Sequence, residues 1–199
     1  MLFTHDVGSE PLVLWYTRPA AEWVEALPIG NGRLGAMVFG GTDEDRLQLN
    51  EDTFWSGGPN DPSHADAAAA LPEARRLIFD RQYAAAHQLI EQRMMARPMW
   101  QCSYQPIGDL RLRFVHDARP EGYRRQLDVD RAVATTRYRV GHVELVREAF
   151  SSAVDQVLVY RVTAGAPGWS SATVELSSPQ VGSVAADGAD TLVMRGRGP

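Results

Sequence analysis

From residue 108 onward, the sequence repeats short segments in which apolar and polar residues alternate. In the first of them, Leu110, Leu112 and Phe114 fall on one face of an extended chain, and arginines fall on the other. Further segments with strand character follow at 123–129, 133–140, 142–150, 156–163, 172–177 and 191–195. Because no helical pattern separates them, this spacing predicts an antiparallel β-sandwich.

The connections and the N-terminal part agree with this fold class. Gly141 marks a hairpin position, and AGAPG at 164–168 marks a turn. Residues 157–162 are apolar except for Arg161, which predicts a central strand covered on both faces. Shorter candidate strands lie in the N-terminal part, at 12–16, 35–39 and 46–49.

One segment, at about 71–95, departs from the strand pattern and has apolar residues at helical spacing. We expect Pro72 and Glu73 in its first turn, where a missing N–H donor and an acid are both tolerated. Asp80 is placed to cap a second helix that begins at Arg81. The segment therefore predicts a helical pair inserted into a mainly β domain.

Charge and cysteine content exclude several classes of function. The 199-residue chain has a net charge of -5 and no basic stripe, so neither nucleic acid nor an anionic membrane is an expected partner. Cys102 is the single cysteine, which rules out an intrachain disulfide, and the histidines lack metal-ligand spacing. No apolar run approaches the roughly 20 residues of a membrane span. We expect no metal and no cofactor.

The first ten residues lack the basic and then apolar pattern of a secretory signal, which leaves the compartment open. The glycine-rich turn around Asn31 lacks the lysine and the glycine spacing of a phosphate-binding loop, so a tight turn is the better interpretation.

Glu51 and Asp52 are the densest carboxylate candidates for glycoside hydrolysis, which uses two acids on opposite sides of one bond. Adjacent residues of an extended chain point to opposite faces, so this pair does not flank one bond. We interpret both as acceptors for backbone donors of a turn. Trp55, next to a Ser-Gly-Gly-Pro stretch, is expected at the surface or in an interface.

Longer blocks then follow one another in a distinctive order over most of the chain. They are LWY at 14–16, AAEW at 20–23, EALPIGNGRLGAMVFG at 25–40, LQLNEDTFWSGGP at 47–59, LPE at 71–73, YQPIGDL at 104–110, YRRQLD at 123–128, REAF at 147–150 and DQVLV at 155–159. In this order they resemble the opening of glycoside hydrolase family 95, whose characteristic activity is α-L-fucosidase.

The resemblance implies a β-super-sandwich of the galactose-mutarotase-like kind, followed in the same polypeptide by a catalytic (α/α)6 barrel. In that family, an inverting mechanism uses a glutamate general acid and an asparagine-centred base supported by an aspartate, all in the barrel. None of these has a counterpart here. Where the family pattern has a glycine within the helical pair, this sequence has Asp80-Arg81-Gln82.

We therefore expect one incomplete β-sandwich domain over 1–199, with the helical insert at 71–95, inactive alone and without the catalytic barrel. Its partners are that barrel and the carbohydrate substrate, a fucosylated glycan. The residues expected at the substrate cleft or in a loop that docks onto the barrel are Asn31, Asn50, Glu51, Asp52 and Trp55.

Two other hypotheses stay open at this point. The chain is alternatively a free-standing carbohydrate-binding sandwich that uses exposed tryptophans. A mutarotase-like enzyme is a third possibility, and it would need a histidine and a glutamate in one cleft, with His116 or His142 beside Glu144 as the candidates.

Overall fold

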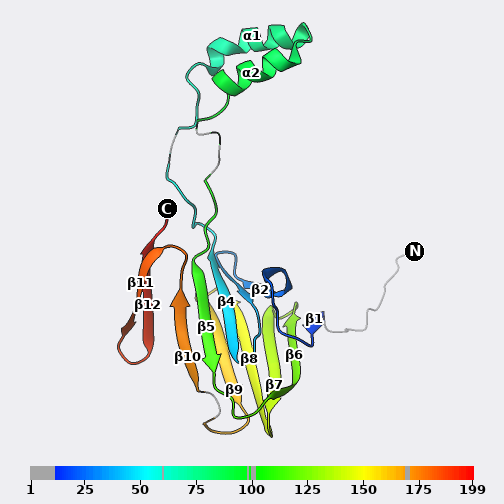
Figure 1. The fold of residues 1–199 in the computed structure, drawn as a ribbon, viewed down its shortest axis with the longest axis vertical. Helices are drawn as coiled ribbons and strands as arrows, with labels where there is room; N and C mark the ends of the chain where they lie inside the picture. The colour runs from blue at the N-terminus through cyan, green and yellow to red at the C-terminus, as the bar shows by residue number, and fades with distance from the viewer. Residues whose placement is uncertain (1–11, 60, 98, 100–101, 169–170) are drawn as a thin grey trace, which may run out of the picture. The chain divides into compact units, whose positions relative to one another are not determined.

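A computed structural model places two five-stranded antiparallel sheets face to face (Figure 1). It describes residues 12–59, 61–97, 99, 102–168 and 171–199. The chain divides into two compact units, one made of the residues up to Phe54 and from Gln105 onward, and the other of Trp55–Tyr104. The first unit is the sandwich, and the second contains the helical pair.

Each sheet of the sandwich draws its strands from separate parts of the chain. The first sheet has the order β1 (Val13–Tyr16), β6 (Pro120–Asp128), β7 (Val133–Val140), β8 (Val143–Ser152) and β9 (Val157–Ala164). The second sheet has the order β10 (Ala172–Ser177), β5 (Gly108–Phe114), β4 (Glu44–Glu51), β3 (Leu34–Val38) and β2 (Leu27–Gly30). A separate hairpin pairs β11 (Val181–Asp187) with β12 (Thr191–Arg197).

The core lies between the two sheets because their strands alternate between apolar and polar residues. Ile29, Leu47 and Phe114 from the second sheet pack with Leu127 and Ala149 from the first. The arginines of β5, by contrast, form ion pairs on the outer face of their sheet. The predicted mainly β, antiparallel sandwich with a helical-pair insert is confirmed.

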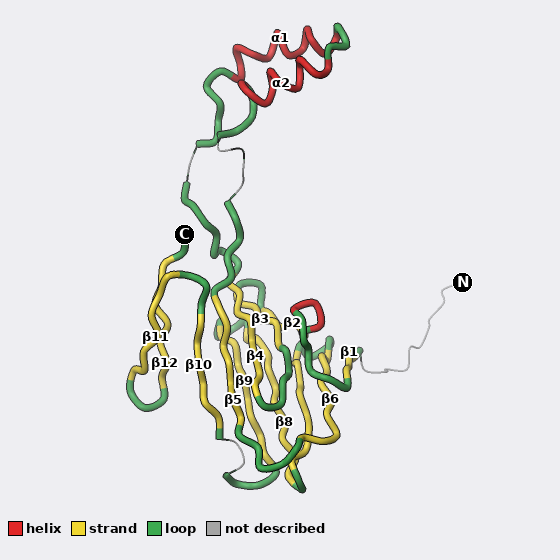
Figure 2. The backbone as a smooth tube through the Cα atoms, in the orientation of Figure 1, coloured by secondary structure: helices red, strands yellow, loops and turns green. Residues whose placement is uncertain are grey.

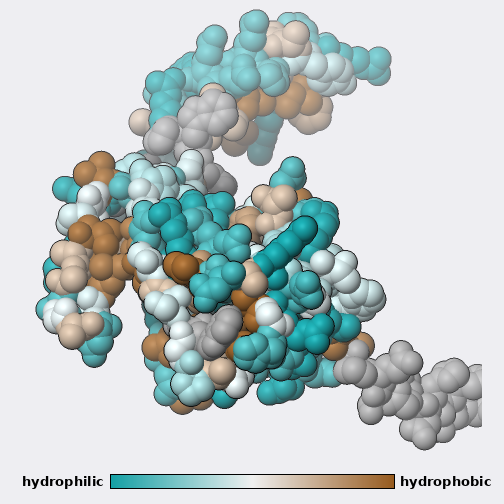
Figure 3. Space-filling view, turned by 60° about the horizontal axis from the view of Figure 1, so that its bottom comes forward, coloured by the Kyte–Doolittle hydropathy of each residue, from teal (hydrophilic) through white to brown (hydrophobic). Residues whose placement is uncertain are grey.

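Hairpin β11–β12 has a different surface from the sandwich proper. Figure 3 shows apolar side chains gathered on its side of the molecule, at the left, and hydrophilic ones over most of the rest. Val181 and Val184 are exposed on β11, as is Val174 on β10.

In the described ranges, helices occur in two places (Figure 2): a short 3-10 turn, η1 (Trp23–Glu25), and the pair α1 (Ala67–Phe79) and α2 (Tyr83–Arg93). The small side chains of Ala70, Ala74 and Ala86 are buried where the two helices meet. Among the described residues, no helix is long and apolar enough to cross a membrane. The first ten residues, on which the signal-peptide expectation depends, lie outside the described ranges.

Two predicted details of the helical pair are wrong. Because α1 begins at Ala67, Pro72 lies inside the helix and not in its first turn. Asp80 does not cap the second helix, which begins at Tyr83 with Gln82 in the capping position. The carboxylate of Asp80 instead accepts a hydrogen bond from Arg76, one turn earlier in α1, at 2.8 Å.

The turn between the helices is a Schellman motif in which Arg81 has the left-handed conformation, with φ of 60°. The amide of Gln82 donates to the carbonyl of Leu77 at 2.8 Å, and that of Arg81 donates to the carbonyl of Ile78 at 3.0 Å. Glycine adopts this conformation without strain. The arginine lies within Asp80-Arg81-Gln82, the stretch where the family resemblance implies a glycine.

The predicted central position of the apolar segment 157–162 is also wrong, because β9 lies at the edge of its sheet. Leu158, Tyr160 and Val162 pack against the core. On the other face, Val157 is exposed. The apolar character of this strand therefore does not reflect cover on both faces.

Candidate functional site

Four of the five residues expected at a functional loop lie together at one end of the second sheet. Asn31 is in the turn between β2 and β3, and β3 pairs with the end of β4, so that Gly35 faces Asn50 and Leu34 faces Glu51. Asp52 follows directly and donates its amide to the carbonyl of Arg33 at 3.0 Å. The fifth, Trp55, belongs to the helical unit, where its ring contacts Tyr104 edge to face at a centroid distance of 4.8 Å.

The side chain of Asn31 holds the β2–β3 turn in place. Its Oδ1 accepts hydrogen bonds from the amides of Arg33 at 3.0 Å and Leu34 at 2.8 Å. Its Nδ2 donates to the carbonyl of Ser152, at the end of β8, at 2.8 Å. Gly32 follows with φ of +94°, which confirms the predicted tight turn. Asn31 thus ties this turn to the opposite sheet.

The carboxylate of Glu51 is held by its neighbours in the same loop. Its Oε2 accepts hydrogen bonds from the amide of Thr53 at 2.9 Å and from the Thr53 hydroxyl at 2.7 Å. Its Oε1 lies 3.6 Å from the guanidinium of Arg33, which also donates to Gln156 Oε1 at 2.7 Å. The Thr53 hydroxyl, then the Thr53 amide and, more weakly, Arg33 lower the pKa of Glu51 below its usual value. A general acid for glycoside hydrolysis needs a raised pKa, so the setting of Glu51 is opposite to that role.

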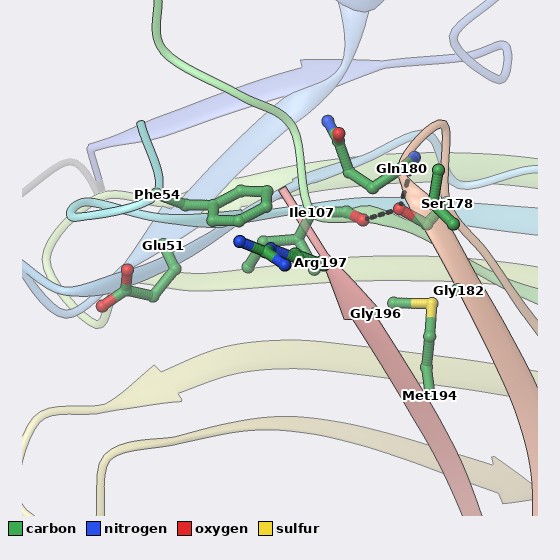
Figure 4. Close-up of a pocket in the computed structure, with 10 residues that line it drawn as sticks. Glu51, Phe54, Ile107, Ser178, Gln180, Gly182, Met194, Gly196 and Arg197 are labelled. Atoms are coloured by element: carbon green, nitrogen blue, oxygen red, sulfur yellow. Dashed lines mark hydrogen bonds between the residues drawn. The ribbon is translucent and has the colours of Figure 1, made fainter. Parts of the chain in front are cut away.

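A pocket of 270 Å³ lies beside Glu51 (Figure 4). Its apolar walls come from Phe54, Ile107 and Met194, and Gln180 and Arg197 add polar groups. It is formed by the end of β4 and the residues after it, the residue before β5, the β10–β11 connection and the β11–β12 hairpin, all within the sandwich unit. This mixture of apolar and hydrogen-bonding groups suits a small polar ligand or the side chains of a packed neighbour.

Of the two histidines considered for a mutarotase-like site, His116 has other partners than Glu144. His116 Nε2 lies 3.1 Å from the Thr42 carbonyl and 3.2 Å from the Tyr138 hydroxyl. Glu144 forms an ion pair with Arg137 at 3.5 Å. Within the described part of the chain, no group of three or more histidine, cysteine or acidic side chains is placed to hold a metal.

Buried charges between the two sheets form a network that the sequence reasoning missed. Asp45 Oδ1 accepts hydrogen bonds from the amides of Gly40 at 2.7 Å and Gly41 at 3.2 Å. The other carboxylate oxygen of Asp45 accepts from the Tyr160 hydroxyl at 2.6 Å and lies 3.6 Å from Arg147, which donates to the Gly41 carbonyl at 2.5 Å. The network therefore fixes the glycine turn between β3 and β4 to the first sheet.

A second buried arginine fixes the segment before β2. Arg125 donates to the carbonyls of Arg18 at 2.8 Å and Glu25 at 2.7 Å, and its guanidinium lies 4.2 Å from the centre of the Tyr16 ring. The alternation along each strand could have indicated the inward direction of both arginines, because residues two apart on a strand point to the same face. Arg125 is two residues from the core residue Leu127, and Arg147 is two residues from the core residue Ala149. Both arginines consequently point inward.

Comparisons with known proteins agree with this architecture. The model for the N-terminal domain of glycosyl hydrolase family 65 matches residues 14–199. Alpha-L-fucosidase 2 of Arabidopsis thaliana is 42% identical over 173 residues, which is 85% of this chain and 20% of that protein. Probable alpha-fucosidase A of Aspergillus niger is 36% identical over 145 residues, or 69% of this chain and 18% of that protein.

A probable alpha-fucosidase A of Aspergillus oryzae is 26% identical over 163 residues, covering 77% of this chain and 22% of its own length. The chain therefore spans about a fifth of the length of the curated relatives it matches. Because the family model matches nearly the whole sandwich and its insert, the chain belongs to the family of glycosyl hydrolase family 65 N-terminal domains.

Proposed function

We propose that this chain is the N-terminal, non-catalytic domain of an inverting α-L-fucosidase of glycoside hydrolase family 95 that acts on fucosylated glycans. The observation that carries the proposal is the match of the chain to about a fifth of proteins named as fucosidases, together with the match to a family of N-terminal domains. In this proposal, a C-terminal barrel of the same polypeptide holds the catalytic acid and base.

The setting of Glu51 supports the non-catalytic part of the proposal. A catalytic acid must hold a proton near neutral pH, whereas Thr53 and Arg33 favour the ionised form of Glu51. The neighbouring Asn31 is used in hydrogen bonds that stabilise the turn. These loop residues form a rigid end of the sandwich, suited to pack against and support the barrel.

The proposal is tested in the full-length protein with Glu51→Gln, which keeps the shape of the side chain and removes its charge. We expect kcat for release of L-fucose to stay within about threefold of the unsubstituted enzyme, because electrostatic groups that act in the transition state cost far more, about 100-fold or above, when removed. Glu175→Gln, on the outer face of the second sheet, is the matched control.

A drop of about 1,000-fold in kcat for Glu51→Gln, with unchanged folding by circular dichroism, would show that Glu51 takes part in the chemistry and would overturn the non-catalytic assignment. The stereochemistry is tested separately by proton NMR of the first sugar released. Inversion predicts the β-anomer from an α-fucoside.

A further inference from the structure

A second polar pocket lies on the outer face of the first sheet and belongs to none of the sites described above. It has a volume of 280 Å³ and is lined by Arg124 and Gln126 of β6 and by Thr135 and Arg137 of β7. Trp15 of β1 is the register partner of Gln126, which in turn pairs with Thr135. The three strands therefore present one row of Trp, Gln and Thr side chains beside two arginines.

The two arginines are direct partners across the β6–β7 pair. Like charges placed opposite each other destabilise a sheet, so such a pair calls for a compensating anion. Arg137 has one in Glu144, at 3.5 Å. Arg124 instead donates to Gln126 Oε1 at 3.0 Å, and its guanidinium lies 5.0 Å from the centre of the Trp15 ring. Among the described residues, no carboxylate forms an ion pair with Arg124.

On the outer face of the second sheet, by contrast, the arginines form ion pairs with carboxylates. Arg46 pairs with Asp109 at 2.9 Å, and Arg111 and Arg113 both pair with Glu44, at 2.9 and 2.8 Å. Farther along the first sheet, Arg161 pairs with Glu148, the register partner of Thr135. Arg124 is thus a cation that the fold leaves uncompensated in a hollow, although the chain as a whole is acidic.

The side chains around this hollow define the chemistry of an occupant. Two guanidinium groups match the planar fork of a carboxylate. The Thr135 hydroxyl and the Gln126 amide suit sugar hydroxyls, and the Trp15 ring offers an apolar edge to a sugar ring. The volume is just under the roughly 300–1,000 Å³ of sites for drug-sized ligands, so it suits a single ring.

From this geometry we infer that the outer face of the first sheet is a binding site for an acidic sugar of the uronic acid class, with its carboxylate between Arg124 and Arg137. This site does not depend on the proposed fucosidase role of the parent protein. Because Glu144 competes for Arg137, Arg124 carries the larger share of the affinity.

The experiment titrates the 199-residue chain with methyl β-D-glucuronoside and follows binding by NMR and calorimetry. The matched neutral probe is methyl β-D-glucoside, which has the same ring without the carboxylate. We expect millimolar affinity for the glucuronoside and at least about tenfold weaker binding of the glucoside. Binding of the glucuronoside should also weaken as salt is raised, because the site is exposed.

Variants then locate the site. Arg124→Gln and Arg137→Gln should each weaken glucuronoside binding about tenfold or more, as expected when a charge-assisted bidentate contact is lost. Arg113→Gln, on the other sheet, should leave it unchanged. Arg124→Gln relieves the like-charge pair, so its thermal midpoint should equal or exceed that of the unsubstituted chain. Thr135→Val provides a second, nearly isosteric variant that should weaken binding without changing the charge.

Several results would overturn the inference. Equal binding of glucoside and glucuronoside would remove the role of the carboxylate. Phosphate that binds as tightly as the glucuronoside, with the same sensitivity to Arg124→Gln, would reveal a simple anion site with no sugar specificity. A lower thermal midpoint for Arg124→Gln would identify Arg124 as a structural residue. Unchanged glucuronoside binding in Arg124→Gln and Thr135→Val would place the ligand elsewhere.

Discussion

At the scale of single residues, the sandwich is organised by the polar groups that it buries. Asp45 and Arg147 are nearly inaccessible to solvent, yet each is held by backbone groups of the turn between β3 and β4. An isolated buried charge would be very costly, so these contacts are what make the burial tolerable. The inward phase of Arg147 could be predicted from strand alternation. Its partners could not, because they come from a turn that is distant in the sequence.

The buried tyrosines beside this network predict a loss of stability in alkali. Burial is the largest cause that raises the pKa of Tyr123, Tyr138 and Tyr160 above the ordinary value of 10.0. In the unfolded chain these hydroxyls ionise near pH 10, whereas in the folded chain their raised pKa keeps them protonated to a higher pH. Their contribution to the free energy of unfolding is therefore complete below about pH 10 and is lost as the pH rises above it.

Denaturant unfolding between about pH 8 and pH 11 measures this effect. Tyr160→Phe should lower the free energy of unfolding near neutral pH by about 1–2 kcal/mol, because the hydrogen bond to Asp45 is lost. Above about pH 10, the free energy of unfolding of this variant should fall less steeply than that of the unsubstituted chain. Tyr83→Phe, at an exposed position, should keep the original slope. Equal slopes in all three proteins would contradict the assignment.

At the scale of elements, alternation in the sequence predicted the strands from β5 to β9 closely, because each has apolar residues that pack on the core. It missed β2, where Pro28 and Gly30 are more typical of a turn, and β11, whose small residues leave a weak pattern. The edge position of β9 could not be predicted, since strand order depends on pairing and not on local pattern. For the loop residues, the sequence could not predict the hydrogen bond from Asn31 to the Ser152 carbonyl, because the two residues are far apart in the chain.

The turn between α1 and α2 offers a prediction at this scale. Arg81→Gly should stabilise the helical pair by about 0.5–1 kcal/mol, because glycine adopts the left-handed conformation without steric cost, partly offset by its flexibility in the unfolded chain. Hydrogen exchange at the Gln82 amide, which bonds to Leu77, reports the change. Arg75→Gly within α1 is the control and should destabilise by about 1 kcal/mol. Faster exchange in Arg81→Gly would contradict the prediction.

At the scale of the whole molecule, the helical unit leaves and rejoins the sandwich at one place. Trp55 and Tyr104 form an antiparallel bridge, and the amide of Ser56 donates to the carbonyl of Ser103 at 2.8 Å. On the sandwich side, the amide of Gln105 donates to the carbonyl of Phe54 at 2.9 Å. The two segments that connect the insert to the sandwich are therefore held together by their own backbone hydrogen bonds.

This closure predicts that the insert can be removed. Replacing residues 56–103 with Asn-Gly, the preferred residues of a two-residue hairpin turn, should leave the sandwich folded. Because a shorter loop costs less entropy to close, the free energy of unfolding should be equal or higher. Circular dichroism and denaturant unfolding test this result, with a Gly-Ser replacement of the same length as the control. Loss of the cooperative transition in both variants would show that the sandwich requires the insert.

The edge position of β9 has a consequence for handling the protein. Among the described strands, β9 pairs with β8 alone, so the other side of its backbone is a template for a further strand. Apart from Arg161, the segment from Val157 to Val162 has the apolar, valine-rich composition that favours aggregation. We therefore predict that Arg161 limits fibril-like association. Arg161→Val should precipitate at a lower protein concentration than the unsubstituted chain.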